Sequence, residues 1–326
     1  MKKIIKFLTF RILNFLYDKI FGKLRDVKHI WKPGNYINFN KYYWSIIERP
    51  LQNRGIYLPL DFKNIKSPAE FKTFHNEHLV LDEFSKLVDN RSGDSEKYFI
   101  DIGAGDGVDM SNTFNLVLNN YKGYMIESDD SKFAKLGVIY RDFPDIQLLK
   151  TIITPDNIVQ LLSALNLPPK LDVLNLDIDS YDYEVLDKIL PKFNFKFLIL
   201  EFNPLFPKSI DFYIKYEKGV KYESPEFYGA SLSIFYKLLK KYNYSAVHVD
   251  RSFLFAIDSN YLNSKIQEKE INELEKTLKS SLINNDPEKW ETLYKFYWSY
   301  SDEEIIDKSK ELFKEYSNYI IKKSEI

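Results

Sequence analysis

Residues 98–111, YFIDIGAGDGVDMS, combine residue types that can bind a ligand. They include Gly103, Gly105 and Gly107, three of only 11 glycines in a chain of 326 residues. The glycines follow an apolar run that contains Asp101. Glycine lets the backbone turn sharply and lets a ligand approach the main chain closely. The sequence therefore predicts a ligand-binding turn between a strand and a helix.

The acids around this turn limit the ligand that it can bind. Asp101 stands two residues before the first glycine, and Asp106 lies inside the turn. Carboxylates there repel a pyrophosphate, and dinucleotide sites use the different spacing Gly-x-Gly-x-x-Gly. Glu127 ends the next apolar run, where an acid can accept hydrogen bonds from ribose hydroxyls. The predicted ligand is a nucleoside with a cationic tail, which disfavours a dinucleotide-dependent oxidoreductase.

A second group of polar side chains ends two later apolar runs. Asp177, Asp179 and Asp182 follow LDVLNL, and Glu201 and Asn203 end LILEFN. The carboxyl ends of parallel strands meet at one edge of a sheet, so these oxygens should converge. Converging oxygen ligands suit a hard cation such as Mg²⁺, with Asp177, Glu201 and Asn203 as ligands. Two other roles stay open for the aspartates: capping the following helix, or acting as a general base without metal.

The elements that must position these groups alternate in type. Five short apolar runs are each followed by a helical pattern or a longer connection, at residues 97–103, 123–128, 146–154, 171–179 and 195–203. This alternation predicts βαβ units and a buried parallel sheet. Two further runs, at residues 244–250 and 252–258, are too close in sequence for a parallel crossover. They therefore predict an antiparallel hairpin.

The sequence divides into three parts. Residues 1–95 form an N-terminal helical extension, residues 96–258 the ligand-binding domain, and residues 259–326 a C-terminal helical segment. In the last part, Ser301 followed by Glu304 has the spacing of a capping box and predicts a helix start.

The N-terminal stretch MKKIIKFLTFRILNFLYDKIFGKLR is rich in both basic and apolar residues. Lys6 and Arg11 interrupt it before the roughly 20 apolar residues that a spanning helix needs. A basic helix with a broad apolar side can lie in a membrane interface. The same side can pack on the protein's own core or on a second subunit. Peripheral membrane contact and a homo-oligomer therefore both stay open.

Composition excludes several classes of protein. The formal net charge is -1, so no global basic field indicates a nucleic-acid partner. The chain has no cysteine, which excludes disulfides, thiolate metal sites and a cysteine nucleophile. The absence of cysteine fits a reducing compartment, and we expect a cytoplasmic location, with membrane association if the N-terminal helix binds lipid.

The motifs FIDIGAGDG, MIES and NLDID resemble those of class I S-adenosylmethionine-dependent methyltransferases, over about residues 95–258. The resemblance implies an α/β fold: a seven-stranded Rossmann-like sheet with an antiparallel last strand, flanked here by N- and C-terminal helical additions. It implies S-adenosylmethionine as cofactor. The implied contacts are Gly103, Gly105 and Gly107 with the methionine part, Asp101 and Asp106 with its amino group or bound water, Glu127 with the ribose, and Ile152 with the adenine.

Asp177, Asp179, Tyr181 and Asp182 also reproduce the Asp-x-Asp-x-Tyr-Asp pattern of macrocin-type sugar O-methyltransferases and related FkbM-like proteins. That family has two adjacent acids after strand five, whereas this chain has Glu201-Phe202-Asn203. The resemblance implies O-methylation of a sugar or glycan-related acceptor, with Asp177 and Asp179 as catalytic residues. Methylation of a lipid or another small molecule is an alternative, and so is a non-catalytic scaffold that keeps the fold.

Overall fold

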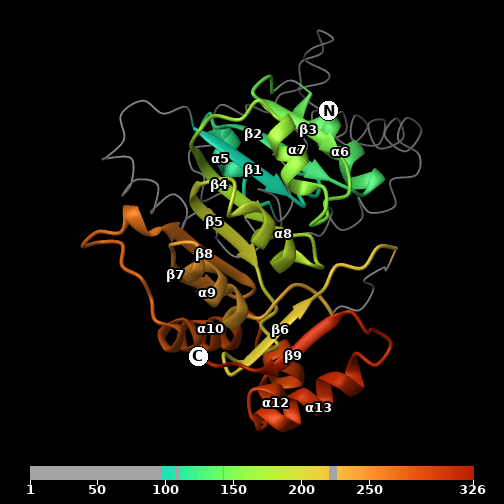
Figure 1. Cartoon of the computed structure of the whole chain (residues 1–326), viewed down its shortest axis with the longest axis vertical. Helices are drawn as coiled ribbons and strands as arrows, with labels where there is room; N and C mark the ends of the chain where they lie inside the picture. Colours follow the sequence, from blue (N-terminus) through green and yellow to red (C-terminus); the bar gives the residue numbers. More distant parts are fainter. Residues whose placement is uncertain (1–96, 108–110, 142, 220–225) are drawn as a thin grey trace, which may run out of the picture. The chain divides into compact units, whose positions relative to one another are not determined.

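The computed structural model describes residues 97–326 except residues 108–110, 142 and 220–225. Its centre is a seven-stranded sheet with the order β3-β2-β1-β4-β5-β8-β7 (Figure 1). The strands are β1 (Tyr98–Ile102), β2 (Lys122–Glu127), β3 (Ile146–Lys150), β4 (Leu171–Leu176), β5 (Phe195–Glu201), β7 (Tyr244–Asp250) and β8 (Phe253–Asp258). The N-terminal extension, for which the sequence predicts a basic helix, lies outside the described residues.

Strand directions agree with the sequence prediction. The first five strands pair in parallel, because each is followed by a crossover. β7 and β8 form the predicted antiparallel hairpin, and β8 runs antiparallel to β5. All six residues of β4 are buried, as expected for a strand at the centre of a sheet that is covered on both faces. The carboxyl ends of β1, β2, β3, β4 and β5 therefore meet at one edge.

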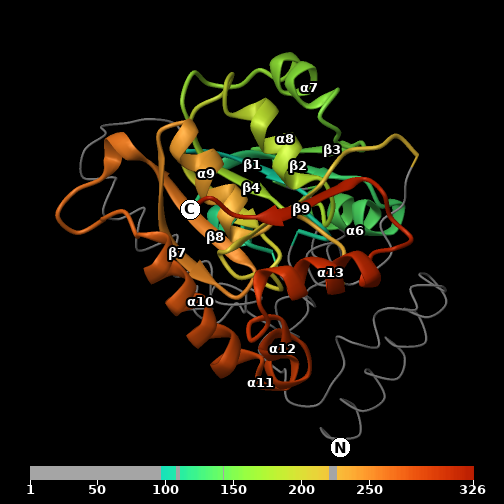
Figure 2. The ribbon, with the colours of Figure 1, turned by 60° about the horizontal axis from the view of Figure 1, so that its bottom comes forward.

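The five parallel strands are connected by helices α5 (Phe114–Leu118), α6 (Asp130–Tyr140), α7 (Ile158–Ala164) and α8 (Asp182–Ile189), and α9 (Leu232–Lys241) precedes the antiparallel hairpin. Helices α7, α8 and α9 lie along one face of the sheet, each in contact with the next (Figure 2). Helix α9 buries its apolar side and carries Lys240 and Lys241 in its last turn, where cations suit the helix dipole.

The segment after the sheet is mostly helical, as predicted. It contains α10 (Ile271–Asn285), α11 (Pro287–Lys289), the π-helical turn η6 (Trp290–Tyr294), α12 (Lys295–Tyr297) and α13 (Asp302–Leu312), after a short 3-10 turn η5 (Ser259–Tyr261). Ser301 and Glu304 form the predicted capping box at the start of α13. In the described part of the chain, no helix is both long enough and apolar enough to cross a membrane.

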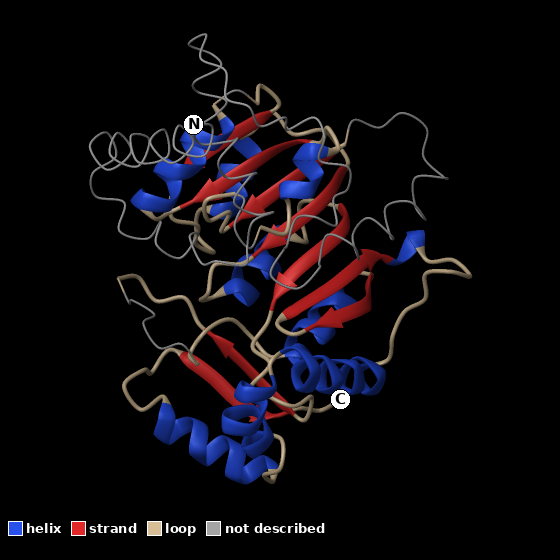
Figure 3. Cartoon of the chain, turned by 180° about the vertical axis from the view of Figure 1, so that it is seen from behind, coloured by secondary structure: helices blue, strands red, loops and turns tan. Residues whose placement is uncertain are grey.

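One strand in this segment was not predicted. β9 (Tyr319–Lys323) pairs antiparallel with β6 (Ile210–Ile214) in a separate two-stranded sheet (Figure 3). The prediction of a purely helical C-terminal segment was therefore wrong at its end. β9 has only five residues, and its partner lies about 100 residues earlier, so no local pattern indicates the pairing. The pairing attaches the C-terminal segment to an element of the preceding domain.

Candidate functional site

The three glycines of the turn after β1 have different roles. All have positive φ angles, +90° at Gly103, +61° at Gly105 and +78° at Gly107. A Cβ on Gly103 would lie 1.6 Å from the carbonyl oxygen of Asp177, so this glycine lets the ends of β1 and β4 touch. A Cβ on Gly107 would collide with the ring of Tyr140. A Cβ on Gly105 would meet nothing within 4 Å, so this position has room for a side chain.

Glu127, at the end of β2, holds the glycine turn in place. Its Oε2 accepts a hydrogen bond from the backbone N–H of Gly105 at 2.8 Å. Its Oε1 accepts from the N–H groups of Ser128 and Asp129, both at 2.7 Å. A carboxylate has about four lone-pair positions. Three are used here, so Oε2 can accept one further hydrogen bond, such as one from a ribose hydroxyl.

Asp101 points into the protein. Its two oxygens accept hydrogen bonds from Thr113 Oγ1 at 2.5 Å and from Asn175 Nδ2 at 2.8 Å. Asn175 in turn accepts from Asn112 Nδ2 at 3.0 Å. Burial raises the pKa of Asp101 to about 6. Each oxygen of Asp101 thus accepts one hydrogen bond from this buried network. The implied contact of Asp101 with the amino group of a ligand stays a prediction.

Asp106 lies in the same turn, half-buried. The hydroxyl of Tyr140 donates to the carbonyl of Gly107 at 2.5 Å. Burial raises the pKa of Tyr140 well above its usual value, and the charges of Asp101 and Asp106 raise it further. Asp106 therefore faces the side of the turn where Tyr140 packs, and it does not line the cavity described next.

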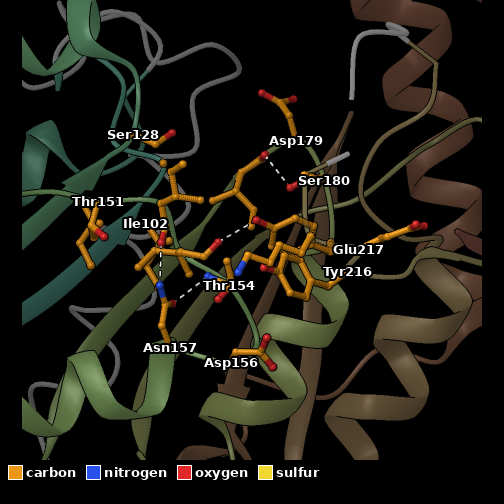
Figure 4. Close-up of a pocket in the computed structure, with 18 residues that line it drawn as sticks. Ile102, Ser128, Thr151, Thr154, Asp156, Asn157, Asp179, Ser180, Tyr216 and Glu217 are labelled. Carbon is orange, nitrogen blue, oxygen red and sulfur yellow. Dashed lines mark hydrogen bonds between the residues drawn. The ribbon is translucent and has the colours of Figure 1, made fainter. Parts of the chain in front are cut away.

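A cavity of about 780 Å³ opens at the carboxyl edge of the sheet (Figure 4). Five connections contribute to its lining: Gly103 after β1, Ser128 after β2, residues 151–154, 156 and 157 after β3, residues 178–181 after β4, and residues 216–219 after β6. Ile152, predicted to lie near an adenine, lines the cavity and is 64% exposed. An exposed apolar side chain in a cavity offers a surface for a flat ring.

The connection after β3 supplies polar groups that sequence reasoning missed. Asn157 Nδ2 donates to the carbonyl of Ile152 at 2.8 Å, and Asn157 Oδ1 accepts from the N–H of Thr154 at 2.8 Å. These bonds fix the loop around Ile152. Asp156 lines the cavity in the same loop (Figure 4). The polar cluster Thr154-Pro-Asp-Asn157 directly after a strand was the available signal.

Asp177, Asp179 and Glu201 form an acidic group at the ends of β4 and β5. Each offers a carboxylate oxygen, and these oxygens lie within 4.8 Å of one another. Burial raises the pKa of Asp177 to about 8, and the charge of Asp179 adds to the effect. Burial and the charge of Asp177 raise the pKa of Glu201 well above its usual value. Burial therefore favours the protonated forms of both Asp177 and Glu201.

The acidic group also contains an unsatisfied acceptor. Within the described part of the chain, Glu201 Oε2 is buried and has no hydrogen-bond partner. A buried carboxylate oxygen without a donor is costly. A cation or a donor group of a ligand would remove this cost. Tyr228 lies nearby: burial raises the pKa of its phenol, and the charge of Glu201 is the second cause.

Asn203 and Asp182 shape the loops around the acidic group. Asn203 Nδ2 donates to the carbonyls of Glu226 and Tyr228 at 2.9 and 3.1 Å, and Asn203 Oδ1 accepts from the N–H of Leu205 at 3.0 Å. Asp182 accepts from the N–H groups of Ile178 and Ser180 at 2.9 and 3.0 Å. Of the predicted metal ligands, the structure therefore brings together Asp177 and Glu201. Asp179 takes the third position, and Asn203 binds backbone instead.

The N-cap residue of α8 is not one of the aspartates. Helix α8 begins after Tyr181, whose side chain makes no capping hydrogen bond, and Asp182 accepts from N–H groups of the preceding loop. Asp179 is exposed and has a φ of +54°, which is unusual for a residue with a side chain. Strained backbone of this kind occurs at functional sites. The open alternatives for the acidic group are thus a metal or a general base.

No family model and no curated protein matches the sequence. Solved structures that are similar to the chain include the N-terminal domain of EvdMO1 with SAH bound, with 10% identity and a TM-score of 0.37 over 70% of this chain and 99% of that chain. The METTL16 MTase domain has 12% identity and a TM-score of 0.35 over 64% of this chain and 74% of that chain. The CurJ carbon methyltransferase has 10% identity and a TM-score of 0.39 over 70% of this chain and 68% of that chain.

These likenesses are remote, and the strand arrangement carries the assignment of the fold. Five parallel strands in the order 3-2-1-4-5 are extended by an antiparallel hairpin whose second strand pairs with β5. The glycine turn follows β1, at the centre of this order. The described chain therefore has the class I methyltransferase fold.

Proposed function

We propose that this protein is an S-adenosylmethionine-dependent methyltransferase that acts on a hydroxyl oxygen of a sugar or glycan-related small molecule. The observation that carries the proposal is the extent of the cavity. Gly103 of the glycine turn and Asp179 of the acidic group line the same cavity. A ligand held at the glycine turn can therefore present its reactive end toward carboxylates that can accept a proton.

The residues around the cavity fit S-adenosylmethionine. Gly105 borders open space, and Glu127 keeps one acceptor position for a ribose hydroxyl. The apolar surface of Ile152 suits the face of an adenine, and Asp156 beside it can accept from an exocyclic amino group. The carboxylates at this edge of the sheet suit a cationic sulfonium ligand and oppose a pyrophosphate.

We assign the role of general base to Asp177, which belongs to the same acidic group as Asp179, a residue that lines the cavity. S-adenosylmethionine, when bound, supplies a methyl group that its sulfonium has already activated. The chain must then align the acceptor hydroxyl and remove its proton. The raised pKa of Asp177, about 8, makes its carboxylate a stronger base than an ordinary aspartate near neutral pH. Asp179, on the cavity side of the acidic group, can orient the hydroxyl.

The acidic group also fits a divalent cation. Three carboxylates whose oxygens lie within 4.8 Å of one another, together with the unsatisfied Glu201 Oε2, form a donor set that Mg²⁺ prefers. Asp177, Asp179 and Glu201 would hold the ion, which could fix the acceptor hydroxyl and lower its pKa. Chelation separates the two mechanisms: activity lost with chelator and restored by Mg²⁺ supports the metal, and full activity in excess chelator supports Asp177 alone.

A sugar acceptor is supported by the spacing of Asp177, Asp179, Tyr181 and Asp182, which resembles macrocin-type enzymes. The proposal is tested first by calorimetry. The full-length protein should bind S-adenosylmethionine and SAH and bind NAD poorly. Methyl transfer from labelled cofactor to a panel of sugars, glycolipids and other alcohols then identifies the acceptor. Absence of cofactor binding would overturn the proposal that the protein is a methyltransferase. Cofactor binding without transfer to any acceptor would favour the alternative of a non-catalytic scaffold.

The proposal for the N-terminal helix is separate. Residues 1–25 lie outside the described residues, and contact with a membrane or a second subunit is a proposal based on their sequence alone. Flotation with anionic vesicles tests it: the full-length protein should float, and a chain without residues 1–25 should stay folded and unbound. Aggregation of the shortened chain, with no flotation of the full-length one, would favour internal packing or an oligomer.

A further inference from the structure

One wall of the cavity does not come from the seven-stranded sheet. Residues 215–219 follow β6, and Tyr216 and Glu217 among them line the cavity (Figure 4). We call residues 215–219 the β6 wall. The ring of Tyr216 lies edge-on to the ring of Tyr181, with centroids 4.9 Å apart. The hydroxyl of Tyr181 donates to the carbonyl of Ile153 at 2.8 Å. The β6 wall thus touches the same side of the cavity that surrounds Ile152.

Two attachments fix the backbone of the β6 wall. The N–H of Lys215 donates to the carbonyl of Asn318 at 2.7 Å, and Asn318 Nδ2 donates to the carbonyl of Lys215 at 2.8 Å. The N–H of Tyr216 donates to the Glu184 carboxylate at 2.8 Å. These three bonds hold two consecutive residues. Tyr216 therefore has a defined position although it lies outside regular secondary structure.

The attachments come from two parts of the chain that are far apart in sequence. Glu184 lies on α8, directly after the loop that carries Asp179. Asn318 directly precedes β9, and the β6–β9 register places Tyr319 opposite Ile214. The same register sets Asn318 beside Lys215. Asn318 is buried, with 7% exposure, so its amide is not diverted to bulk water. The C-terminal strand thus determines where the wall of the cavity stands.

We propose that Asn318 and Glu184 are positioning residues for the cofactor cavity, which act by holding Tyr216 against the bound nucleoside. The proposal rests on the proposed function, because it takes the cavity to bind S-adenosylmethionine and SAH. It gives the C-terminal segment a direct part in cofactor affinity, although no residue of that segment lines the cavity.

SAH affinity of the full-length protein, measured by calorimetry, tests the proposal. Asn318→Asp keeps the size of the side chain but sets a carboxylate oxygen against the Lys215 carbonyl. Glu184→Ala removes the acceptor for Tyr216, whereas Glu184→Gln keeps an acceptor oxygen. We expect about fivefold to tenfold weaker SAH binding for Asn318→Asp and Glu184→Ala, the effect of one hydrogen bond, and near wild-type binding for Glu184→Gln.

Asn263→Ala is the matched control. Asn263 also holds a loop of the C-terminal half, by accepting from the N–H groups of Lys265 and Ile266 at 2.8 and 2.9 Å, but it does not line or brace the cavity. Its replacement should leave SAH affinity unchanged. Unfolding curves for every variant identify a temperature at which all are folded, so that a loss of stability is not read as a loss of binding.

A spectroscopic readout follows Tyr216 itself. The indole introduced by Tyr216→Trp should change its emission when SAH is added, and adding Asn318→Asp should reduce that change. Wild-type affinity in both Asn318→Asp and Glu184→Ala, or an indole that does not respond to bound SAH, would overturn the inference. A wild-type protein that fails to bind SAH would instead overturn the proposed function, which separates the two failures.

Discussion

The glycine turn and the acidic group lie at the same edge of the sheet, but their acids are in opposite situations. Asp101 and Glu127 each accept hydrogen bonds at both oxygens, from side chains or backbone N–H groups. In the acidic group, Glu201 Oε2 has no partner within the described residues, and the pKa values of Asp177 and Glu201 are raised. The acids of the glycine turn hold the groups around them in place, whereas the acidic group keeps a buried oxygen that a cation or a ligand can use.

The largest effect is expected on methyl transfer, from a substitution in the acidic group. Asp177→Asn keeps the shape of the side chain but removes its negative charge and its ability to take a proton, and it weakens any bond to a cation. We expect methyl transfer to fall by about 10²–10⁴-fold, the usual contribution of a general base. SAH affinity should change little, because the glycine turn is intact. Calorimetry and a labelled-methyl assay measure the two quantities.

Asp187→Ala is the control for this variant. Asp187 lies on α8 and pairs with Lys241 at 2.9 Å at the surface. Its loss should leave both transfer and SAH affinity at the wild-type level. Equal transfer rates for Asp177→Asn and the wild type would remove Asp177 from the mechanism.

The glycine turn offers a matched pair of substitutions. Gly103→Ala places a Cβ 1.6 Å from the Asp177 carbonyl oxygen, whereas Gly105→Ala meets nothing within 4 Å. We expect Gly103→Ala to lower the free energy of unfolding by more than about 3 kcal/mol, among the larger effects of single substitutions. Gly105→Ala has only the cost of its positive φ, about 1–2 kcal/mol. Urea unfolding compares them, and equal destabilisation would contradict the geometry at β1 and β4.

The buried Asp101 should make the free energy of unfolding depend on pH. Its folded pKa of about 6 exceeds the ordinary value of 3.8, so the folded state binds the proton more tightly. The stabilising contribution is full below about pH 4 and is lost as pH rises through 6. The loss amounts to a few kcal/mol, since one pKa unit corresponds to about 1.4 kcal/mol. Asp101→Asn should lack this dependence.

Urea unfolding of the wild type and Asp101→Asn at several pH values between 4 and 7.5 measures this pH dependence of stability. The amide changes the hydrogen bonds with Thr113 and Asn175, which adds an offset that does not depend on pH. The informative quantity is therefore the change with pH in the stability difference between the variant and the wild type. The difference in stability, variant minus wild type, should rise with pH and then level off. Parallel curves would show that Asp101 is not a destabilised carboxylate.

The smallest effect is expected at Glu127. Glu127→Gln keeps one acceptor oxygen but turns an NH₂ group toward the backbone N–H groups that the carboxylate accepts. We expect SAH to bind more weakly by about 1–3 kcal/mol, the range for hydrogen bonds to a charged group. Calorimetry of SAH measures it, with Asp129→Asn as a control at the neighbouring helix cap. Unchanged affinity in Glu127→Gln would show that the ligand does not depend on this carboxylate.

The sequence by itself determined the five parallel strands, the hairpin and the glycine turn. Each is a short-range property: apolar runs of strand length, a gap too short for a crossover, and glycines at positions of positive φ. It also determined that acids gather at the ends of β4 and β5, because parallel strands place their carboxyl ends at one edge.

Only the tertiary structure determined which hydrogen-bond partners each polar side chain of the site has. Asp101 accepts a hydrogen bond from Asn175, 74 residues away, and so belongs to a buried network that its sequence neighbours do not indicate. Asn203 donates to the carbonyl of Tyr228, 25 residues away, and an oxygen of Asp179 lies within 4.8 Å of oxygens of Asp177 and Glu201. A side chain's hydrogen-bond partner depends on segments that meet only after folding. For the same reason, the sequence did not reveal that β9 pairs with β6 and thereby sets the wall of the cavity.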